Sequence, residues 1–283
     1  MEPIIQTEKL CHIYSAGTPF ERGALVDVDF TAYRGEYLGI IGHTGSGKST
    51  LIQHLNGLLK PTSGRVLFEG RDIWETKERT RQTRFQVGLV FQYPEYQLFE
   101  ETCYKDIAFG PKNMGLDEAE IDRRVHEAAD FVGLDPALLE RSPFELSGGQ
   151  KRRVAVAGVM AMKPRILVLD EPAAGLDPEG RDDILSEVKE YHKKTGTTVL
   201  LVSHSMEDIA KYANRVLVMS KGKVVLEGTP KEVFSQTEKV RSLHLDVPQA
   251  AELRDELVKA GIDLPEGIID TGECAQALYE LLQ

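Results

Sequence analysis

Residues 42–49 read GHTGSGKS, which follows the pattern G-x-x-x-x-G-K-[ST]. Its glycines allow a tight turn that aims several backbone N–H groups at one cluster of phosphate oxygens. Lys48 is expected to reach the β- and γ-phosphates of a nucleotide, and the Ser49 hydroxyl is expected to bind Mg²⁺. A glycine-rich turn without a ligand is the alternative interpretation. The predicted nucleotide-binding residues are Gly42, His43, Thr44, Gly45, Ser46, Gly47, Lys48, Ser49 and Thr50.

Two carboxylates follow an apolar run in RILVLDEP at 165–172. Ligands of open α/β sheets bind beyond the carboxyl ends of the strands, which is where this pair would lie. Asp170 is expected to bind Mg²⁺ directly or through a second shell. Glu171 projects to the other side of the chain, so it is better suited to orient and polarise an attacking water. Alone, the pair is typical of a solvated loop; with the phosphate loop, it predicts nucleotide hydrolysis.

A third segment, ELSGGQKRR at 145–153, has the features of a helix start that binds anions. The Ser147 hydroxyl can cap the helix, and the two glycines allow a close approach to its free N–H groups. In isolation Ser-Gly-Gly would be an ordinary turn. The residues predicted to bind a second phosphate group are Ser147, Gly148, Gly149 and Gln150.

Short apolar runs, separated by helix-like segments, predict the elements that hold these residues. This order is typical of a buried parallel sheet with crossover helices. The runs lie at 37–42, 87–91, 165–170, 197–203 and 215–220.

Other patterns predict the remaining layers. Alternation of apolar and polar residues at 25–32 and 64–70 predicts an antiparallel layer near the N-terminus. Residues 117–132 predict a helix with an acidic first turn, and Lys221-Gly222 predicts a tight turn between two strands. Beyond about residue 235 the sequence becomes helical, as in 250–261 and 275–283.

Composition excludes several classes of protein. The chain of 283 residues is 41% hydrophobic, enough for one large α/β domain with an appendage. A net charge of -11 argues against a main role in coating nucleic acid. Three scattered cysteines fit no disulfide framework, which favours a reducing, cytoplasmic setting. The N-terminus lacks the features of a secretory signal, and the apolar runs are shorter than the roughly 20 residues of a membrane span.

The order of these motifs resembles the nucleotide-binding subunit of ABC transporters. In that family ATP is sandwiched between two subunits, each offering its phosphate loop to the signature motif of the other, so hydrolysis requires a dimer. The resemblance implies a catalytic Gln92 that also touches Mg²⁺, Asp177 in communication across the dimer, and a catalytic His204 at the γ-phosphate. It also implies that Tyr14 stacks on adenine. The alternatives are strand-end packing for His204 and simple packing for Tyr14.

Two segments, 91–116 and 171–181, narrow the resemblance to the energy-coupling factor (ECF) transporter ATPases, and more closely to the second of their two paired ATPases. The segment at 244–265 resembles the C-terminal extension of that group, which helps to hold the ATPase pair together. The implied partners are a second ATPase, either a paralogue or a second copy, a membrane scaffold subunit and a separate membrane subunit that captures a vitamin or metal ion. The implied location is the cytoplasmic face of the cell membrane, as a peripheral protein.

The same resemblance implies where the membrane scaffold docks. Exposed aromatic and aliphatic side chains rimmed by acids suit such a contact. The predicted docking residues are Glu95, Tyr96, Leu98, Phe99, Glu100 and Glu101.

The predicted fold is thus an α/β P-loop ABC ATPase domain over 1–235, with a helical subdomain at about 93–163 and a C-terminal helical extension at 236–283 that contacts the dimer partner. A soluble ABC ATPase acting on ribosomes or DNA is the alternative function. Such proteins usually carry two nucleotide domains in one chain or long coiled-coil insertions, and this sequence has neither. An unrelated P-loop kinase or GTPase would leave the signature motif and His204 unexplained.

Overall fold

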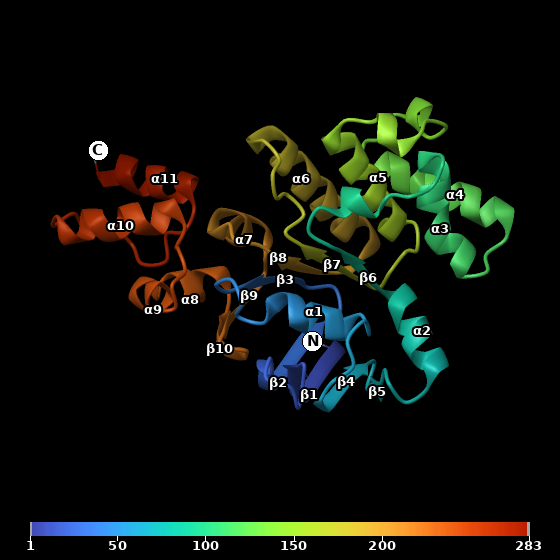
Figure 1. Cartoon of the computed structure of the whole chain (residues 1–283). Coiled ribbons are helices and arrows are strands. Elements are labelled where there is room, and N and C mark those ends of the chain that lie inside the picture. Colours follow the sequence, from blue (N-terminus) through green and yellow to red (C-terminus); the bar gives the residue numbers. More distant parts are fainter. Residues whose placement is uncertain (1, 282–283) are drawn as a thin grey trace.

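A computed structural model describes residues 2–281 of the chain (Figure 1). Its centre is a six-stranded sheet in the order β10-β9-β3-β8-β7-β6. Five strands are parallel, and β10 joins the edge by an antiparallel hairpin with β9. The strands are β3 (Tyr37–Ile41), β6 (Val87–Val90), β7 (Ile166–Asp170), β8 (Thr198–Val202), β9 (Arg215–Ser220) and β10 (Lys223–Gly228). The predicted parallel sheet is therefore confirmed.

The hairpin between β9 and β10 turns at the residues that the sequence indicated. Lys221 and Gly222 both have positive φ angles, 48° and 74°. Two such residues in succession match the twist of the flanking strands, and glycine adopts this conformation without steric cost.

A second, antiparallel sheet has the order β2-β1-β4-β5 and confirms the predicted N-terminal layer. Its strands are β1 (Pro3–Tyr14), β2 (Arg22–Tyr33), β4 (Ser63–Phe68) and β5 (Arg71–Asp72). β1 pairs with both β2 and β4, although its sequence does not alternate cleanly. The reason is an irregularity between Thr7 and Leu10, where Lys9 takes a φ of 46° and the side-chain alternation shifts.

The two faces of the central sheet bury different cores. On one face Leu38 and Ile40 pack with the antiparallel sheet and with α1 (Lys48–Leu55), which lies between the two sheets. On the other face Tyr37 and Ile41 pack with the helices. Alternating side chains of one strand thus enter opposite cores, as expected for a sheet covered on both sides.

Helices cover the second face, and those in the region predicted as a helical subdomain lie to one side in Figure 1. The subdomain contains the short 3₁₀ helix η1 (Pro94–Gln97), α3 (Cys103–Asn113), α4 (Glu118–Phe131) and α5 (Gly148–Met160). Asp117 caps α4, so the helix predicted at 117–132 is confirmed. The other α-helices before residue 230 are α2 (Lys77–Gln86), α6 (Pro178–Thr195) and α7 (Met206–Tyr212), and two further 3₁₀ helices are η2 (Pro136–Leu138) and η3 (Pro143–Glu145).

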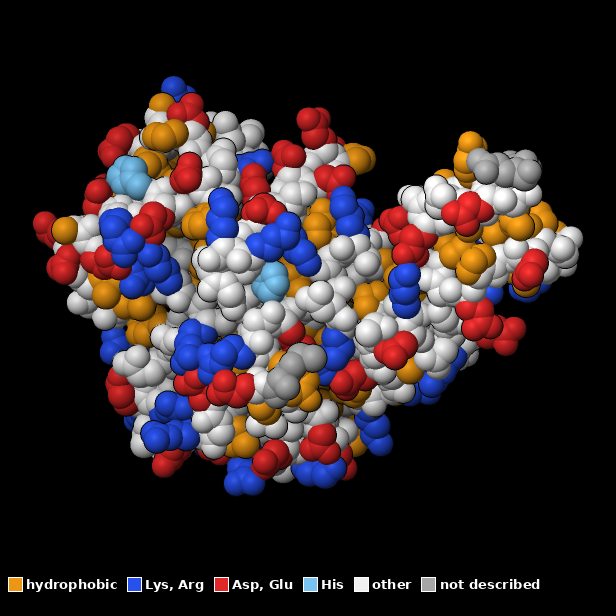
Figure 2. Space-filling view, turned by 180° about the vertical axis from the view of Figure 1, so that it is seen from behind, with side chains coloured by type: hydrophobic (Ala, Val, Ile, Leu, Met, Phe, Trp, Pro, Cys, Tyr) orange, Lys and Arg blue, Asp and Glu red, His pale blue; other side chains and the backbone are white. Residues whose placement is uncertain are grey.

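The C-terminal helices form a lobe at the opposite end of the molecule (Figures 1 and 2). They are α8 (Pro230–Phe234), α9 (Thr237–Ser242), α10 (Gln249–Lys259) and α11 (Thr271–Leu281). Residues 282 and 283 of the helix predicted at 275–283 lie outside the described residues. Val240, Leu245 and Val247 belong to the main core, whereas α10 and α11 share a small core around Leu264 and Cys274. Packing is therefore continuous across the boundary predicted at 235–236.

Between residues 2 and 281, no helix has both the length and the apolar character needed to cross a membrane.

Candidate functional site

The phosphate loop joins the end of β3 to the start of α1. Gly47 has a φ of 105°, and a Cβ at this position would lie 2.8 Å from the backbone oxygen of Ala24. Only glycine fits this position without strain or a clash. Gly47 is also the N-cap of α1 and makes no side-chain cap, so the first N–H groups of α1 are not capped by that residue. This geometry suits an anion at the helix N-terminus.

Lys48 is 7% exposed and points back into the loop. Its Nζ donates to the backbone oxygens of Gly42 at 2.5 Å and His43 at 3.3 Å. Burial lowers the pKa of its ammonium group, and the nearby carboxylates Asp170 and Glu171 act in the opposite direction. The loop thus holds a desolvated cation beside two acids.

Asp170 ends strand β7 and is 7% exposed. Burial raises the pKa of its carboxyl group, while a hydrogen bond from the Ser49 side chain and the charge of Lys48 oppose that rise. The carboxylate of Asp170 and the hydroxyl of Ser49 therefore lie together, at the carboxyl end of the sheet. They are hard oxygen donors of the kind that Mg²⁺ prefers.

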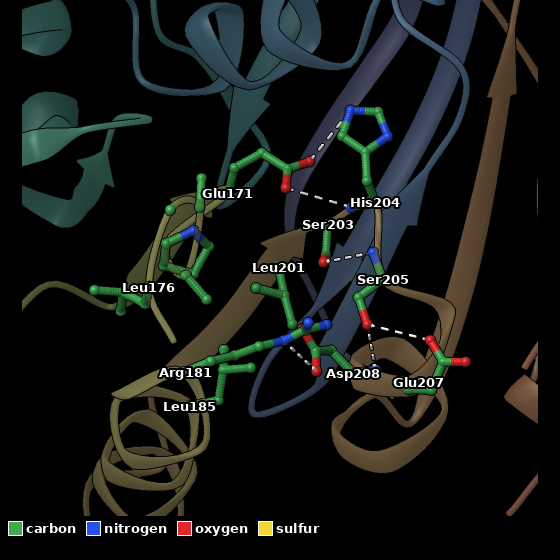
Figure 3. Close-up of a pocket in the computed structure, with 14 residues that line it drawn as sticks. Glu171, Leu176, Arg181, Leu185, Leu201, Ser203, His204, Ser205, Glu207 and Asp208 are labelled. Carbon is green, nitrogen blue, oxygen red and sulfur yellow. Dashed lines mark hydrogen bonds and ion pairs between the residues drawn. The ribbon is translucent and has the colours of Figure 1, made fainter. Parts of the chain in front are cut away.

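Glu171 follows directly and adopts a left-handed backbone, with a φ of 52°. Its Oε2 accepts a hydrogen bond from the His204 backbone N–H at 3.4 Å, and its Oε1 lies 3.5 Å from Nε2 of the His204 ring (Figure 3). Oε1 is buried and has no hydrogen-bond partner among the described residues. Burial is the main cause that raises the pKa of Glu171 to about 7, and the charge of Asp170 adds to it. A carboxylate with a pKa near neutrality suits a general base.

One cavity of about 340 Å³ brings most of the predicted residues together. Its wall combines the phosphate loop with side chains from β7, from the end of β6 and from the end of β8. The lining residues are Thr44, Gly45, Ser46, Gly47, Lys48, Ser49, Thr50, Gln92, Asp170, Glu171 and His204. Glycine-cradled N–H groups, one lysine and clustered oxygen donors fit a nucleotide phosphate with Mg²⁺.

A second cavity, of about 440 Å³, shares Glu171 and His204 with the first (Figure 3). Across it Arg181 of α6 binds Asp208 of α7, with Nη2 2.8 Å from Oδ2. On the side of β8, the Ser205 N–H donates to Ser203 Oγ at 3.0 Å. These contacts fix the backbone on both sides of His204.

The signature segment lies apart from the phosphate cavity. The Ser147 hydroxyl accepts from the Gln150 N–H at 3.3 Å, and the Gln150 side chain accepts from the Ser147 N–H at 3.0 Å. This capping box starts α5, as the sequence predicted for the serine. Gly149 and Asp177 line a separate cavity of about 320 Å³. Asp177 in turn caps α6 by accepting from the Gly180 N–H at 2.9 Å.

Tyr14 lies at the rim of the phosphate loop. Its hydroxyl is 3.2 Å from Thr50 Oγ1, and the residue is 39% exposed. Directly opposite it on β2 stands Arg22. The Nη2 of Arg22 lies 3.2 Å from the position that a Cβ on Gly45 would occupy. Sequence reasoning missed this cation because no motif includes it; the pairing of β1 with β2 is the signal that places it there.

The predicted docking residues surround η1. Tyr96 and Phe99 are exposed by 84% and 59%, and Phe99 meets the exposed Phe109 edge to face. Leu98 is half-buried against the main core. Glu95 differs from the other two acids because its carboxylate binds a buried arginine, Arg152, at 2.9 and 3.1 Å. Glu100 is half-buried, and Glu101 is exposed and pairs with Lys105 at 2.5 Å.

Comparisons with known proteins agree on the family. The family model described as ABC transporter matches residues 25–174. The chain is 53% identical to the energy-coupling factor transporter ATP-binding protein EcfA2 of Caldanaerobacter subterraneus subsp. tengcongensis, covering 99% of this chain and 98% of that protein. It is 54% identical to EcfA2 of Clostridium tetani, covering 98% of this chain and 96% of that protein.

Solved structures show the same relationship. The chain matches cbiO1 from Clostridium perfringens, described as part of the ABC transporter complex cbiONQ, with a TM-score of 0.76 and 41% identity over 90% of this chain and 100% of that one. It also matches the ATP-binding cassette MJ0796, solved as a dimer bound to ADP and Pi, with a TM-score of 0.72 and 26% identity over 80% of this chain and 99% of that one. The chain therefore belongs to the ATP-binding proteins of ABC transporters, in the energy-coupling factor group.

Proposed function

We propose that this chain hydrolyses ATP as one ATPase subunit of an energy-coupling factor importer, and so powers uptake of a vitamin or metal ion through separate membrane subunits. The observation that carries the proposal is the cavity in which the phosphate loop meets Asp170, Glu171, Gln92 and His204. A complete signature segment in the same chain supports a role as an active ATPase.

The residues divide the reaction among them. The phosphate loop and Lys48 hold the β- and γ-phosphates of ATP. Ser49, Asp170 and Gln92 supply oxygen ligands for Mg²⁺, which when bound would neutralise phosphate charge. Glu171 orients the attacking water and accepts its proton, and His204 contacts the γ-phosphate. Catalysis comes mainly from positioning and charge neutralisation.

Hydrolysis in this proposal needs a partner ATPase. Ser147, Gly148, Gly149 and Gln150 do not line the phosphate cavity of their own chain. Their capped helix start, with free N–H groups, suits the γ-phosphate bound by a partner. Asp177 begins α6 beside the same cavity as Gly149 and would signal across the interface. The partner is a paralogue or a second copy of this chain.

The docking residues and the C-terminal lobe support a peripheral location on the cytoplasmic face of the cell membrane. Tyr96 and Phe99 expose an aromatic surface a few residues from Gln92. The membrane scaffold would cover this surface, and its basic groups would meet Glu100 and Glu101. Basic groups of the scaffold that approach Glu95 would share its carboxylate with Arg152.

The proposal is tested by purifying the full chain from its own membranes and identifying what accompanies it. We expect a second ATPase, a scaffold and a substrate-capturing membrane protein, together with ATP hydrolysis. Glu171→Gln is expected to retain ATP binding and to lower turnover at least 100-fold. Hydrolysis by that variant at the parental rate would refute the role of Glu171. Recovery with ribosomes or DNA and no membrane protein would refute the transport assignment.

A further inference from the structure

Arg152 is a charged side chain buried in the helical subdomain, with 3% of its surface exposed. Its Nε and Nη2 donate to the two carboxylate oxygens of Glu95 at 3.1 and 2.9 Å. Its Nη1 donates to the backbone oxygens of Pro172 at 3.2 Å and Ala174 at 2.7 Å. All three guanidinium nitrogens are therefore used, in the fork geometry that arginine provides.

The partners of Arg152 belong to parts of the chain with different proposed tasks. Glu95 lies in η1, three residues after Gln92 and among the docking residues. Pro172 and Ala174 lie in the loop that directly follows Glu171. Arg152 itself lies on α5, two residues after Gln150. One side chain thus connects the docking segment, the signature helix and the loop of the catalytic glutamate.

The loop after Glu171 depends on such support. Glu171 has a left-handed backbone, which is costly for a non-glycine residue and persists only where its surroundings hold it. Within the loop the Ala174 N–H donates a hydrogen bond to the backbone oxygen of Glu171 at 3.1 Å. Arg152 adds two hydrogen bonds to carbonyls of the same turn. A small change in the position of the guanidinium would therefore change the position of the Glu171 carboxylate.

We propose that Arg152 is a positioning residue that links the docking segment to the loop of Glu171, so that displacement of Glu95 by the membrane scaffold changes the alignment of the catalytic carboxylate. The proposal rests on the proposed function and adds the route by which docking would reach the reaction. Arg152 contacts no residue of the phosphate loop in the described structure, so its effect is expected on the rate of hydrolysis and not on ATP binding.

The test compares Arg152→Lys with Arg153→Lys in the full chain assembled with its natural ATPase partner. Lysine keeps the charge but lacks the planar fork, so its single ammonium cannot reproduce the spread of contacts to Glu95 and the two carbonyls. Arg153 is the matched control, since it is the next residue on α5 and also forms ion pairs, with Glu187 and Asp183 of α6.

For Arg152→Lys we expect kcat for ATP to fall at least about tenfold while KM for ATP stays within about twofold. For Arg153→Lys we expect kcat within about twofold of the parent, even if this variant loses as much thermal stability as Arg152→Lys does. An equal loss of kcat in both variants, or an unchanged kcat in Arg152→Lys, would overturn the proposal.

The link to Glu95 is tested by a double-mutant cycle. If Glu95 acts through Arg152, Glu95→Gln will lower kcat, and adding it to Arg152→Lys will produce no further loss. Additive losses would show that the two residues act separately and would overturn the link. Failure of the parental assembly to hydrolyse ATP is a different result, because it would refute the proposed function and this inference with it.

Discussion

Glu171 carries an acid group that the fold keeps from ionising easily. Its pKa is raised from the ordinary 4.5 to about 7, mainly by burial. The folded protein therefore favours the neutral acid, and the fold loses stability as pH rises from the unfolded pKa to the folded one. The rise of the pKa corresponds to a loss of ~3 kcal/mol in the free energy of unfolding. This loss is complete above about pH 7 and absent below about pH 4.5.

Glu171→Gln removes this ionisation and should therefore stabilise the protein without nucleotide. We expect the variant to have a higher Tm than the parent at pH 8 and a similar Tm near pH 4.5. Thermal unfolding of both proteins across this range measures the difference. A gain that is independent of pH would show that burial of the charge is not its cause.

Arg22 is a second residue whose role can be tested by substitution. Its guanidinium lies beside Gly45 in the phosphate loop, so it can pair with a phosphate group bound there. Loss of one exposed charged contact is worth ~1 kcal/mol, which corresponds to about fivefold in affinity. We expect Arg22→Gln to weaken ATP binding by about that factor in equilibrium titration. Arg71→Gln, on an exposed strand of the same sheet, is expected to leave affinity unchanged.

At this scale the sequence predicted the residues that lie in motifs and did not single out Arg152 or Arg22, whose contacts join distant segments. The phosphate loop, Asp170 and Glu171 were accessible because their chemistry follows from neighbours a few positions away. Arg152 lies 57 residues from Glu95, and their pairing follows only from the packing of α5 against η1. Arg22 becomes recognisable only once β1 and β2 are paired.

At the scale of elements, α5 depends on Ser147 for its start as well as for its proposed function. Removing a capping serine costs about 1 kcal/mol, while aspartate preserves the cap. Ser147→Ala should therefore lower the Tm by about 2–4 °C. Ser147→Asp should keep the parental Tm but place a negative charge against the phosphate of the partner's ATP.

We accordingly expect Ser147→Asp to bind nucleotide normally as an isolated chain and to lose most ATP hydrolysis at the partner's site after assembly. Calorimetry and steady-state ATPase assays on the same preparations measure both effects. Normal hydrolysis by the assembled Ser147→Asp protein would contradict the composite-site model. A large fall in its Tm would show that the aspartate does not preserve the cap.

The elements themselves were predicted where periodicity is regular. The buried strands of the central sheet are short and uniformly apolar, so their positions were clear. β1 was missed because its irregular pairing interrupts the alternation of side chains. The helices α3 and α2 were also not predicted. α3 contains Pro111, a residue that ordinarily ends a helix, and α2 is strongly polar, with Thr80 and Thr83 as its buried residues.

At the scale of the whole molecule, the acidic residues of the proposed docking surface lie outside the set that lines the phosphate-loop cavity. Glu100 and Glu101 follow the exposed aromatic side chains of Tyr96 and Phe99, while Gln92 lines the phosphate-loop cavity. We expect Glu100→Lys with Glu101→Lys to reduce co-purification with the membrane scaffold several-fold, because like charges would then meet. ATP binding by the purified chain should not change. Glu75→Lys, at an exposed position before α2, serves as the control.

The C-terminal lobe is the second surface that we propose takes part in assembly. Its described helices, together with the loop after α10, expose an apolar set comprising Leu253, Val258, Ile262, Tyr279 and Leu281. These side chains lie beyond the small core shared by α10 and α11, and orange groups mark this lobe in Figure 2. Such a surface supports the predicted contact between paired ATPases.

The separation of Ser147 from the phosphate cavity has a genetic consequence. If two copies of this chain pair, a Glu171→Gln chain and a Ser147→Asp chain are each inactive when paired with themselves. In a mixed pair both lesions fall in one composite site, and the other site contains only parental residues. Each mixed pair should then have about half of the parental activity, and coexpression of the two alleles with random pairing should restore about a quarter of it. Absence of such intragenic complementation would indicate pairing with a paralogue instead.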